Sequence, residues 1–345
     1  MAGQSIIEDP EPLQIGYIPE SFIDRDKEQD RLKALFTDEA GTGAGNLRIY
    51  GPRGNGKTHL VRNQMEDASD TVNTCYIPCY RHKTQYKVLK RIVSQLTDEE
   101  VADGHHAAAL KRELEKRVGV LDAIVVLDEI EFLLLNDGED LLYYLSRTNG
   151  VNVVLISSNY SELASRVDER TLSSLRLEQL RFEPYTAAEA YQILEDRVQK
   201  AFRPRSIQQE ALTYIASTTA NPRIGLYWLR AAAGAATDAV TEPVVNKAES
   251  KAYDYAMSLL DRFTDHHGLI YQAIKELTHE ALPPFQTGQI YNRYQDICES
   301  YGVEALSHRR ISDFLKHFEL LGSGESLDGG EVSRQFKGVE AGDCR

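Results

Sequence analysis

Cysteine is scarce in this chain of 345 residues, which has only four: Cys75, Cys79, Cys298 and Cys344. So few and so scattered cysteines argue against a disulfide framework or a cysteine-based metal site. No uninterrupted apolar run of about 18 residues occurs, which predicts that nothing spans a membrane. The first dozen residues are polar and acidic and lack the apolar centre of a secretory leader. Together these absences predict a reduced, cytoplasmic protein.

Lysine is also scarce, and the balance of charge is strongly acidic. The 14 lysines and 25 arginines face 53 aspartates and glutamates, which gives a net charge of −14. A field of this sign repels nucleic acid at low salt. One hypothesis is that the protein works in concentrated salt, where the Debye length falls to a few ångströms. An ordinary acidic intracellular protein is the alternative, and the composition is compatible with both.

The most informative feature that is present is a glycine-rich segment directly after an apolar strand. Residues 47–58 have the sequence LRIYGPRGNGKT, which contains the pattern G-x-x-x-x-G-K-T. Its glycines let backbone N–H groups surround a phosphate, while Lys57 supplies charge to the β- and γ-phosphates and Thr58 a hydroxyl ligand for Mg²⁺. A helix expected over residues 59–67 points its positive dipole end at the same anion. The predicted phosphate-binding loop comprises Gly51, Pro52, Arg53, Gly54, Asn55, Gly56, Lys57 and Thr58.

Two acids follow a second apolar strand. Residues 123–127 predict a buried strand, and Asp128 and Glu129 come directly after it. The carboxyl end of a parallel strand lies where ligands bind in such sheets, so Asp128 is the expected Mg²⁺ partner and Glu129 the base that polarises the attacking water. Asn159 ends a further strand over residues 151–158, and its amide can orient that water. A turn-forming or helix-capping role for Asn159 is the alternative.

The order of elements predicts an α/β fold with a parallel sheet. Apolar runs separated by helix-length segments indicate βαβ units. The strands are expected at residues 47–50, 74–78, 123–127, 151–157 and 179–182. A helix is expected over residues 24–36 and a helical region over 186–236. The polar stretch 237–250, which contains Pro243, is a candidate interdomain joint.

Two arginines downstream are candidates for phosphate contacts. Arg170 lies in the segment VDERTLSSL and Arg223 in the segment ANPRIG. Developing charge on a phosphoryl group favours a guanidinium fork, which can come from the same chain or from a neighbour. Ordinary surface ion pairs are the commoner use of arginine, and that alternative stays open from the residues alone.

In this order the motifs resemble an AAA+ ATPase. More narrowly, they resemble the archaeal replication initiators related to origin recognition complex subunit one and cell division control protein six. The matching segments are residues 17–20 with Arg25, then 51–58, 80–84, 127–130, 157–159, 168–175, 182–185 and 221–223. The resemblance implies that Asn159 is sensor 1, Arg223 is sensor 2, and Arg170 can serve the nucleotide of a neighbouring subunit. It also implies ATP or ADP with Mg²⁺ as cofactors, and an adenine pocket lined by residues 17–25.

The last 90 residues contain three helix-like segments, expected over 261–277, 287–301 and 307–320. Ser307 is a suitable N-cap for the third, and His308, Arg309 and Arg310 project from its start, where a recognition helix meets DNA. The block resembles the winged-helix domain of the same family, with its wing over residues 322–336. From Met257 to Arg345 there are 9 basic against 14 acidic residues, which predicts weak binding or a shallow salt dependence. A helical packing or dimerisation module is the alternative.

The sequence therefore predicts a P-loop AAA+ base with a parallel sheet over residues 1–185, a small α-helical lid and joint over 186–250, and a C-terminal winged-helix domain over 251–345. We expect a slowly hydrolysing ATPase that binds double-stranded DNA, recognises replication origins and helps recruit the minichromosome maintenance helicase, with self-association. Two alternatives remain. One is a nucleotide-gated regulator or plasmid-maintenance ATPase without an origin role, and the other is a DNA-binding module with structural ADP. The pairs His105–His106 and His266–His267 are not expected to bind metal.

Overall fold

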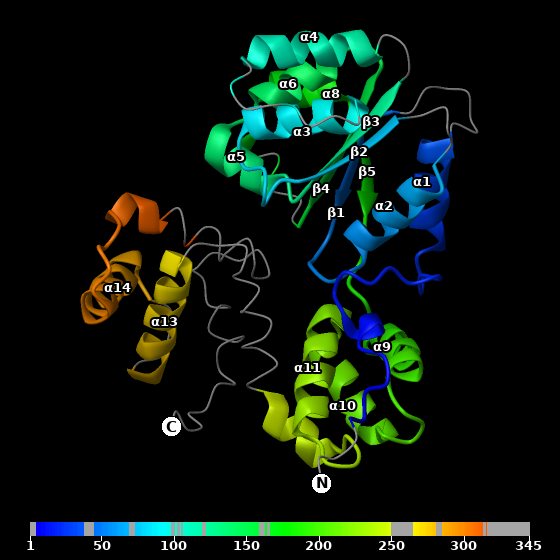
Figure 1. Cartoon of the computed structure of the whole chain (residues 1–345), viewed down its shortest axis with the longest axis vertical. Coiled ribbons are helices and arrows are strands. Elements are labelled where there is room, and N and C mark those ends of the chain that lie inside the picture. Colours follow the sequence, from blue (N-terminus) through cyan, green and yellow to red (C-terminus); the bar gives the residue numbers. More distant parts are fainter. Residues whose placement is uncertain are drawn as a thin grey trace. The chain divides into compact units, whose positions relative to one another are not determined.

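The computed structural model describes residues 5–37, 45–68, 73–97, 101, 104, 106–118, 122–158, 163, 166–249, 265–280, 285–312 and 315. The chain divides into two compact units (Figure 1). One is Ile18–Pro184, and the other combines Met1–Tyr17 with Tyr185–Arg345. The predicted limits of the base, residues 1 and 185, stay a prediction. The first residues instead group with the lid, because Ile6 and Leu13 are buried in the lid core.

A five-stranded parallel sheet forms the centre of the first unit. Its strands are β1 (Leu47–Tyr50), β2 (Asn73–Pro78), β3 (Ala123–Asp128), β4 (Val151–Ser157) and β5 (Glu178–Arg181). They lie in the order β2-β3-β4-β1-β5, and every neighbouring pair is parallel. All five strands predicted from the sequence are confirmed. Strand β3 is buried along its whole length, as expected for a central strand covered on both faces.

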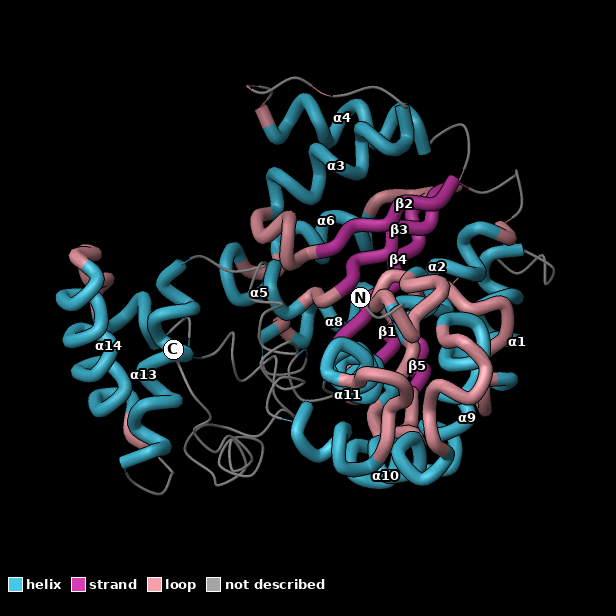
Figure 2. Tube along the Cα trace, turned by 60° about the horizontal axis from the view of Figure 1, so that its bottom comes forward, coloured by secondary structure: helices cyan, strands magenta, loops and turns pink. Residues whose placement is uncertain are grey.

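Helices cover both faces of this sheet (Figure 2). Helices α1 (Asp26–Thr37) and α2 (Lys57–Glu66) pack on the face that carries Ile124, Val126 and Ile156. Because side chains alternate along a strand, Val125 and Leu127 of β3 point to the opposite face. The helices α3 (Gln85–Thr97), α4 (Ala107–Val118), α5 (Glu131–Asp137), α6 (Asp140–Arg147) and α8 (Glu169–Leu175) complete the unit. The predicted α/β fold is thereby confirmed.

The lid consists of α9 (Ala187–Ala201), α10 (Gln209–Thr219) and α11 (Pro222–Ala235), with the short 3-10 helix η1 (Glu11–Leu13). Trp228 is fully buried at its centre, and the indole nitrogen donates to the carbonyl oxygen of Val245 at 2.8 Å. The stretch predicted as a joint differs from expectation, because residues 242–249 are helical and Val245 and Ala248 belong to this core. Burying these two apolar side chains holds most of the stretch against the lid.

The C-terminal block has its own small core. Helices α13 (Asp265–Glu280) and α14 (Thr287–Tyr301) precede a helical segment that covers residues 308–312. Ile270, Ile290, Tyr294 and Ile311 are among the side chains buried between them. The predicted wing over residues 322–336 lies outside the described residues. Within the described part of the chain, the helices are too short or too polar to cross a membrane.

Candidate nucleotide-binding site

The loop between β1 and α2 requires glycine at three positions. Gly51, Gly54 and Gly56 have φ angles of +148°, +86° and +85°, a region that side chains rarely adopt. A Cβ atom on Gly51 would lie 2.2 Å from the carbonyl oxygen of Phe182, which follows β5. The loop is therefore pressed against the chain that leaves β5. The bare backbone that this contact demands is also what allows N–H groups to approach a phosphate.

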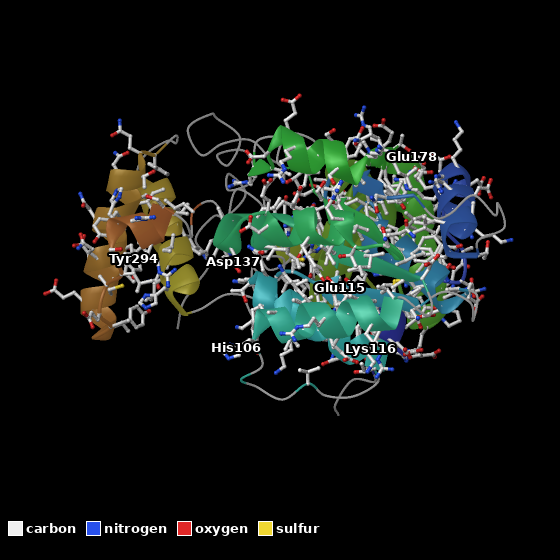
Figure 3. The ribbon with its side chains drawn as sticks, turned by 90° about the horizontal axis from the view of Figure 1, so that it is seen from above. His106, Glu115, Lys116, Asp137, Glu178 and Tyr294 are labelled. Atoms are coloured by element: carbon white, nitrogen blue, oxygen red, sulfur yellow. The ribbon has the colours of Figure 1, made fainter. Side chains whose placement is uncertain are left out.

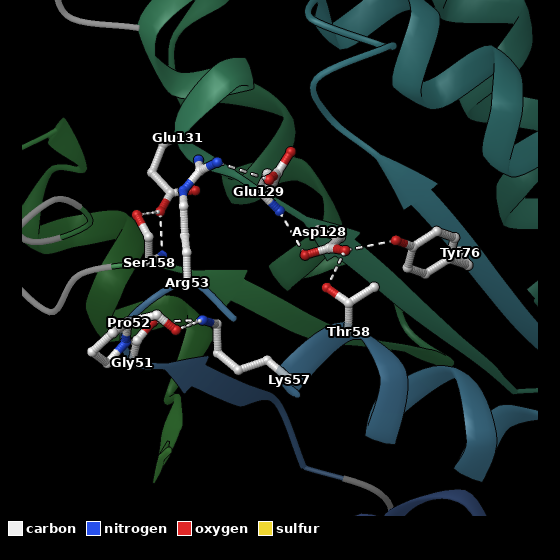
Figure 4. Close-up of polar contacts among 10 residues, drawn as sticks. All are labelled: Gly51, Pro52, Arg53, Lys57, Thr58, Tyr76, Asp128, Glu129, Glu131 and Ser158. Atoms are coloured by element: carbon white, nitrogen blue, oxygen red, sulfur yellow. Dashed lines mark hydrogen bonds and ion pairs between the residues drawn. The ribbon is translucent and has the colours of Figure 1, made fainter. Parts of the chain in front are cut away.

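Lys57 begins α2 with its side chain folded onto the loop. Its Nζ atom donates to the carbonyl oxygens of Gly51 at 2.5 Å and Pro52 at 2.8 Å (Figure 4). Burial, with the nearby Arg53 guanidinium as a second cause, lowers the pKa of Lys57 to about 8. The ammonium sits at the N-terminus of a helix, where an anion is favoured. Lys57 is thus placed to bind a polyphosphate.

Asp128 accepts hydrogen bonds from two hydroxyl groups on neighbouring elements. Its Oδ2 atom accepts from Thr58 Oγ1 at 2.8 Å and from the Tyr76 hydroxyl at 2.6 Å. Its Oδ1 atom accepts from the backbone N–H of Glu129 at 2.9 Å. Burial, and after it the charge of Glu129, raises the pKa of Asp128 to about 6, although the two hydroxyl groups act in the opposite direction.

The Thr58 and Asp128 oxygens form a donor set that fits Mg²⁺. This cation prefers hard oxygen ligands and keeps several waters, so one hydroxyl and one carboxylate beside substrate phosphates suffice. The described residues contain no cluster of three or more His, Cys, Asp or Glu that could hold a metal by itself. His106, exposed at the start of α4, belongs to no such cluster (Figure 3). His105 and the side chain of His267 lie outside the described residues.

Glu129 has a backbone conformation that is unusual for its residue type. Its φ angle is +52°, in the left-handed region, which costs about 1–2 kcal/mol for a residue with a Cβ atom. The Glu129 carboxylate forms an ion pair with Arg53 of the phosphate loop at 3.3 Å between Nη1 and Oε1. Backbone strain of this kind persists where the surroundings hold it in place, and it is concentrated at functional sites.

Glu131 and Ser158 join the first turn of α5 to the end of β4. The Glu131 Oε1 atom accepts from the backbone N–H of Ser158 at 2.5 Å and from its hydroxyl at 2.8 Å (Figure 4). Glu131 is 1% exposed, so these hydrogen bonds are shielded from water. Asn159, the predicted sensor 1, is the next residue but lies outside the described residues.

Arg25 contacts the segment that follows β5. Its guanidinium donates to the carbonyl oxygen of Glu183 at 2.7 Å and lies 5.4 Å from the centre of the Phe182 ring. Asn55 of the phosphate loop donates to the same Glu183 oxygen at 3.0 Å. The structure thus brings Arg25 to the chain that supports the loop. A direct contact with the nucleotide stays a prediction.

The two downstream arginines lie apart in the chain and in their surroundings. Arg170 on α8 is exposed, and its guanidinium donates to the Tyr143 hydroxyl of α6 at 2.5 Å and lies 4.3 Å from the centre of that ring. Arg223 occupies the first turn of α11, where Asn221 Oδ1 accepts from its backbone N–H at 3.1 Å. Arg223 belongs to the other compact unit, so its approach to the nucleotide stays a prediction.

The predicted DNA-contacting side chains are exposed at the start of the last described helical segment. His308, Arg309 and Arg310 are all exposed, while Ile311 is fully buried. The backbone just before them is held by α14, because the N–H of Leu306 donates to the Tyr294 hydroxyl at 3.0 Å. The same hydroxyl also pairs with His266 Nδ1 at 2.8 Å. Figure 3 shows Tyr294 within this block.

Sequence reasoning missed the contacts of Tyr76, Glu131 and the Arg53–Glu129 pair. In the sequence, Tyr76 looks like an ordinary tyrosine of a strand, and Glu131 looks like an ordinary acid in the first turn of a helix. No spacing in the sequence pairs a loop arginine with an acid 76 positions away. The contact of Tyr76 with Asp128 depends on the parallel register of β2 and β3, which sets Pro78 opposite Asp128.

Comparison with known proteins agrees with this geometry. Residues 40–167 match the model of an AAA domain, and residues 258–327 match the C-terminal winged-helix domain of CDC6. The ORC1-type DNA replication protein 1 of Methanothermobacter thermautotrophicus is 30% identical over 92% of this chain and 88% of that protein.

Two solved structures share the fold. The Aeropyrum pernix ORC1 protein in complex with DNA has a TM-score of 0.73 and 26% identity, with coverage of 96% of this chain and 97% of that one. The ADP form of the Aeropyrum pernix ORC2 protein has a TM-score of 0.62 and 22% identity over 92% of this chain and 90% of that one. The chain therefore belongs to the ORC1-type family of DNA replication proteins, which act in replication initiation.

Proposed function

We propose that the chain is an ATP-controlled replication initiator that binds origin DNA and helps recruit the minichromosome maintenance helicase. The observation that carries the proposal is the hydrogen bond between Thr58 and Asp128 beside a loop that contains Gly51 and Lys57. A hydroxyl, a carboxylate and an ammonium converge there on the end of a helix. This is the set of groups that a Mg²⁺–nucleoside triphosphate requires.

The residues proposed for the nucleotide site have separate roles. Lys57 and the first N–H groups of α2 bind the β- and γ-phosphates, and Thr58 with Asp128 holds Mg²⁺, which neutralises phosphate charge. Glu129 orients and polarises the attacking water. Asn159 and Arg223 report whether the terminal phosphate is present. Slow hydrolysis then moves the protein between states of different affinity for DNA or partners.

DNA binding is assigned to the winged-helix block. The Aeropyrum pernix ORC1 relative is described in complex with DNA, and this chain is similar to it over 96% of its length. His308, Arg309 and Arg310 are exposed at the start of a helical segment, which supports contacts with phosphates and base edges. The exposed Arg170 supports self-association in which it completes the nucleotide site of a neighbouring copy.

Mapping of bound DNA across the genome, in cells at their native salt, tests the proposal. The expected result is enrichment at a replication origin for the wild-type protein and loss of that enrichment for Lys57→Ala. Lys27→Ala, which changes an exposed lysine of α1, is the matched control and should bind as the wild type does. Enrichment confined to other chromosomal sites or to a plasmid would instead support a regulator or a plasmid-maintenance ATPase.

Glu129→Gln separates a switch from a protein with structural ADP. In a switch, the substitution leaves ATP unhydrolysed in the purified protein and abolishes function. If the nucleotide content and function stay unchanged, ADP is structural and turnover has no role.

A further inference from the structure

We propose that Arg53 binds the terminal phosphate of a nucleoside triphosphate and, until that phosphate arrives, restrains the catalytic carboxylate of Glu129. The inference rests on the proposed nucleotide-binding function and specifies how that site is regulated. It assigns to one loop side chain the task of coupling triphosphate binding to the release of Glu129.

The restraining contact is the ion pair between the two side chains. Arg53 Nη1 lies 3.3 Å from Glu129 Oε1, and the side chains are only 13% and 19% exposed (Figure 4). An ion pair in such a position is screened less than a surface pair. The backbone of Glu129 is also held, because its N–H donates to Asp128 Oδ1 at 2.9 Å. The carboxylate is therefore tied to the phosphate loop and is not free to orient water.

The charge of the loop indicates what displaces Glu129. Lys57 Nζ donates at 2.8 Å to the carbonyl oxygen of Pro52, the residue directly before Arg53, so the two cations share one short loop. Two cations that repel each other inside one loop are stabilised by an anion with several charges. A triphosphate carries more charge than one carboxylate, and a guanidinium binds phosphate oxygens with two parallel hydrogen bonds. A triphosphate can therefore displace Glu129 as the ion-pair partner of Arg53.

The exchange distinguishes ATP from ADP. A diphosphate binds beside Lys57 but lacks the γ-phosphate, so the ion pair between Arg53 and Glu129 stays intact. The γ-phosphate of a triphosphate pairs with the Arg53 guanidinium, and the carboxylate of Glu129 can then contact the attacking water. No covalent bond changes in this step; one ion pair replaces another.

Equilibrium binding of ADP and of a non-hydrolysable ATP analogue, both with Mg²⁺, tests the exchange in the full-length chain. Arg53→Met should weaken binding of the ATP analogue at least ~10-fold, the value of one charge-assisted hydrogen bond, and change ADP binding less than ~3-fold. Arg112→Met, which changes an exposed α4 arginine, should alter neither. An equal loss for both nucleotides, or no loss, would overturn the proposal.

Glu129→Gln tests the restraint itself. Removing the carboxylate charge frees Arg53, so the ATP analogue should bind about 5-fold tighter while ADP binding changes little. This gain should vanish in the Arg53→Met background. A gain that persists without Arg53 would show that the ion pair restrains nothing.

A second variant and the binding of the wild type serve as controls. If Arg53→Met unfolds, Arg53→Lys retains a charge without the planar fork and should lose part of the preference for the triphosphate; full wild-type preference in Arg53→Lys would contradict the bidentate contact. Failure of the wild-type chain to bind any nucleotide would refute the proposed function. Normal binding by the wild type with unchanged discrimination in Arg53→Met would refute only the role of Arg53.

Discussion

The proposed nucleotide site of the base and the proposed DNA-contacting segment of the C-terminal block are built in opposite ways. In the base, Lys57, Asp128 and Glu129 are each held by a hydrogen bond or ion pair to another element or loop residue. In the C-terminal block, Arg309 and Arg310 are exposed beside the buried apolar side chains of Ile311 and Leu315.

This difference predicts how each region responds to substitution. Groups held inside a network are preorganised, so removing one disturbs the others and the effects are not additive. Exposed cations act through phosphate contacts that weaken with salt and add approximately independently. A single substitution in the base should therefore cause a large loss of nucleotide binding. Each substitution of an exposed cation in the C-terminal block should lower DNA affinity by a smaller step.

A pair of glycine substitutions gives the largest expected contrast. Gly51→Ala would place a Cβ atom 2.2 Å from the Phe182 carbonyl oxygen in a loop with φ of +148°, whereas a Cβ atom on Gly288 of α14 meets nothing within 4 Å. Gly51→Ala should destabilise the base by about 1–3 kcal/mol or more and abolish nucleotide binding. Gly288→Ala should change stability by less than about 1 kcal/mol, in the stabilising direction. Thermal unfolding and nucleotide titration measure both; equal behaviour of the two variants would refute the contrast.

Removing two cations from the C-terminal block tests the gradual response. Arg309→Ala with Arg310→Ala should lower DNA affinity by roughly 10- to 100-fold at low salt and reduce the salt dependence by about 2 counterions. Nucleotide affinity should stay unchanged. Lys27→Ala with Lys33→Ala removes two exposed charges of α1 and is the matched control. If the control lowers DNA affinity as much, the basic start of this segment is not the contact.

Acid should weaken the Mg²⁺-dependent part of nucleotide binding. Asp128 has a pKa of about 6 in the free protein, above its ordinary value, because it is buried beside Glu129. Mg²⁺ needs the carboxylate form, so this part of the affinity is present above pH 6 and lost as the pH falls through 6, by up to about 10-fold per pH unit.

Titrations from pH 5 to 8, each repeated with EDTA, isolate that part. Asp128→Asn should give a flat profile with the affinity that the wild type has in EDTA. A wild-type profile that is flat through pH 6 would show that Asp128 does not hold the cation.

Tyr76→Phe is the smallest change and probes a contact that only the structure revealed. Loss of the hydroxyl removes one of the hydrogen bonds that orient Asp128 Oδ2. Nucleotide affinity with Mg²⁺ should fall about 5-fold, corresponding to about 1 kcal/mol, and affinity in EDTA should not change. Tyr143→Phe, which removes the hydroxyl that pairs with Arg170, is the control. A loss of equal size with and without Mg²⁺ would assign Tyr76 to general packing.

Local patterns predicted the framework of the base because its motifs are contiguous. Strand β1 lies over residues 47–50 as predicted, α2 starts at Lys57 rather than at residue 59, and β3 ends at Asp128, one residue later than expected. Each depends on residue types that are close in the chain. The same holds for α14, predicted and observed over Thr287–Tyr301.

Contacts that cross the sheet could not be predicted in the same way. The partnership of Tyr76 with Asp128 depends on the parallel register of β2 and β3, which no spacing encodes. Glu131 looks in the sequence like an ordinary acid of a first helical turn. Only the structure shows that it is buried and accepts a hydrogen bond from the backbone N–H of Ser158. The polar stretch before residue 250 hid two apolar residues that complete the lid core, Val245 and Ala248.

We expect the nucleotide held at Lys57 and Asp128 to control the DNA affinity of the C-terminal block. This coupling is measured as the DNA affinity with Mg²⁺ and either ADP or a non-hydrolysable ATP analogue, at several salt concentrations. The two nucleotides should give DNA affinities that differ by at least about 5-fold in the wild type, equivalent to about 1 kcal/mol of coupling. The difference should disappear in Lys57→Ala. Equal DNA affinity with both nucleotides in the wild type would show that the nucleotide does not control DNA binding.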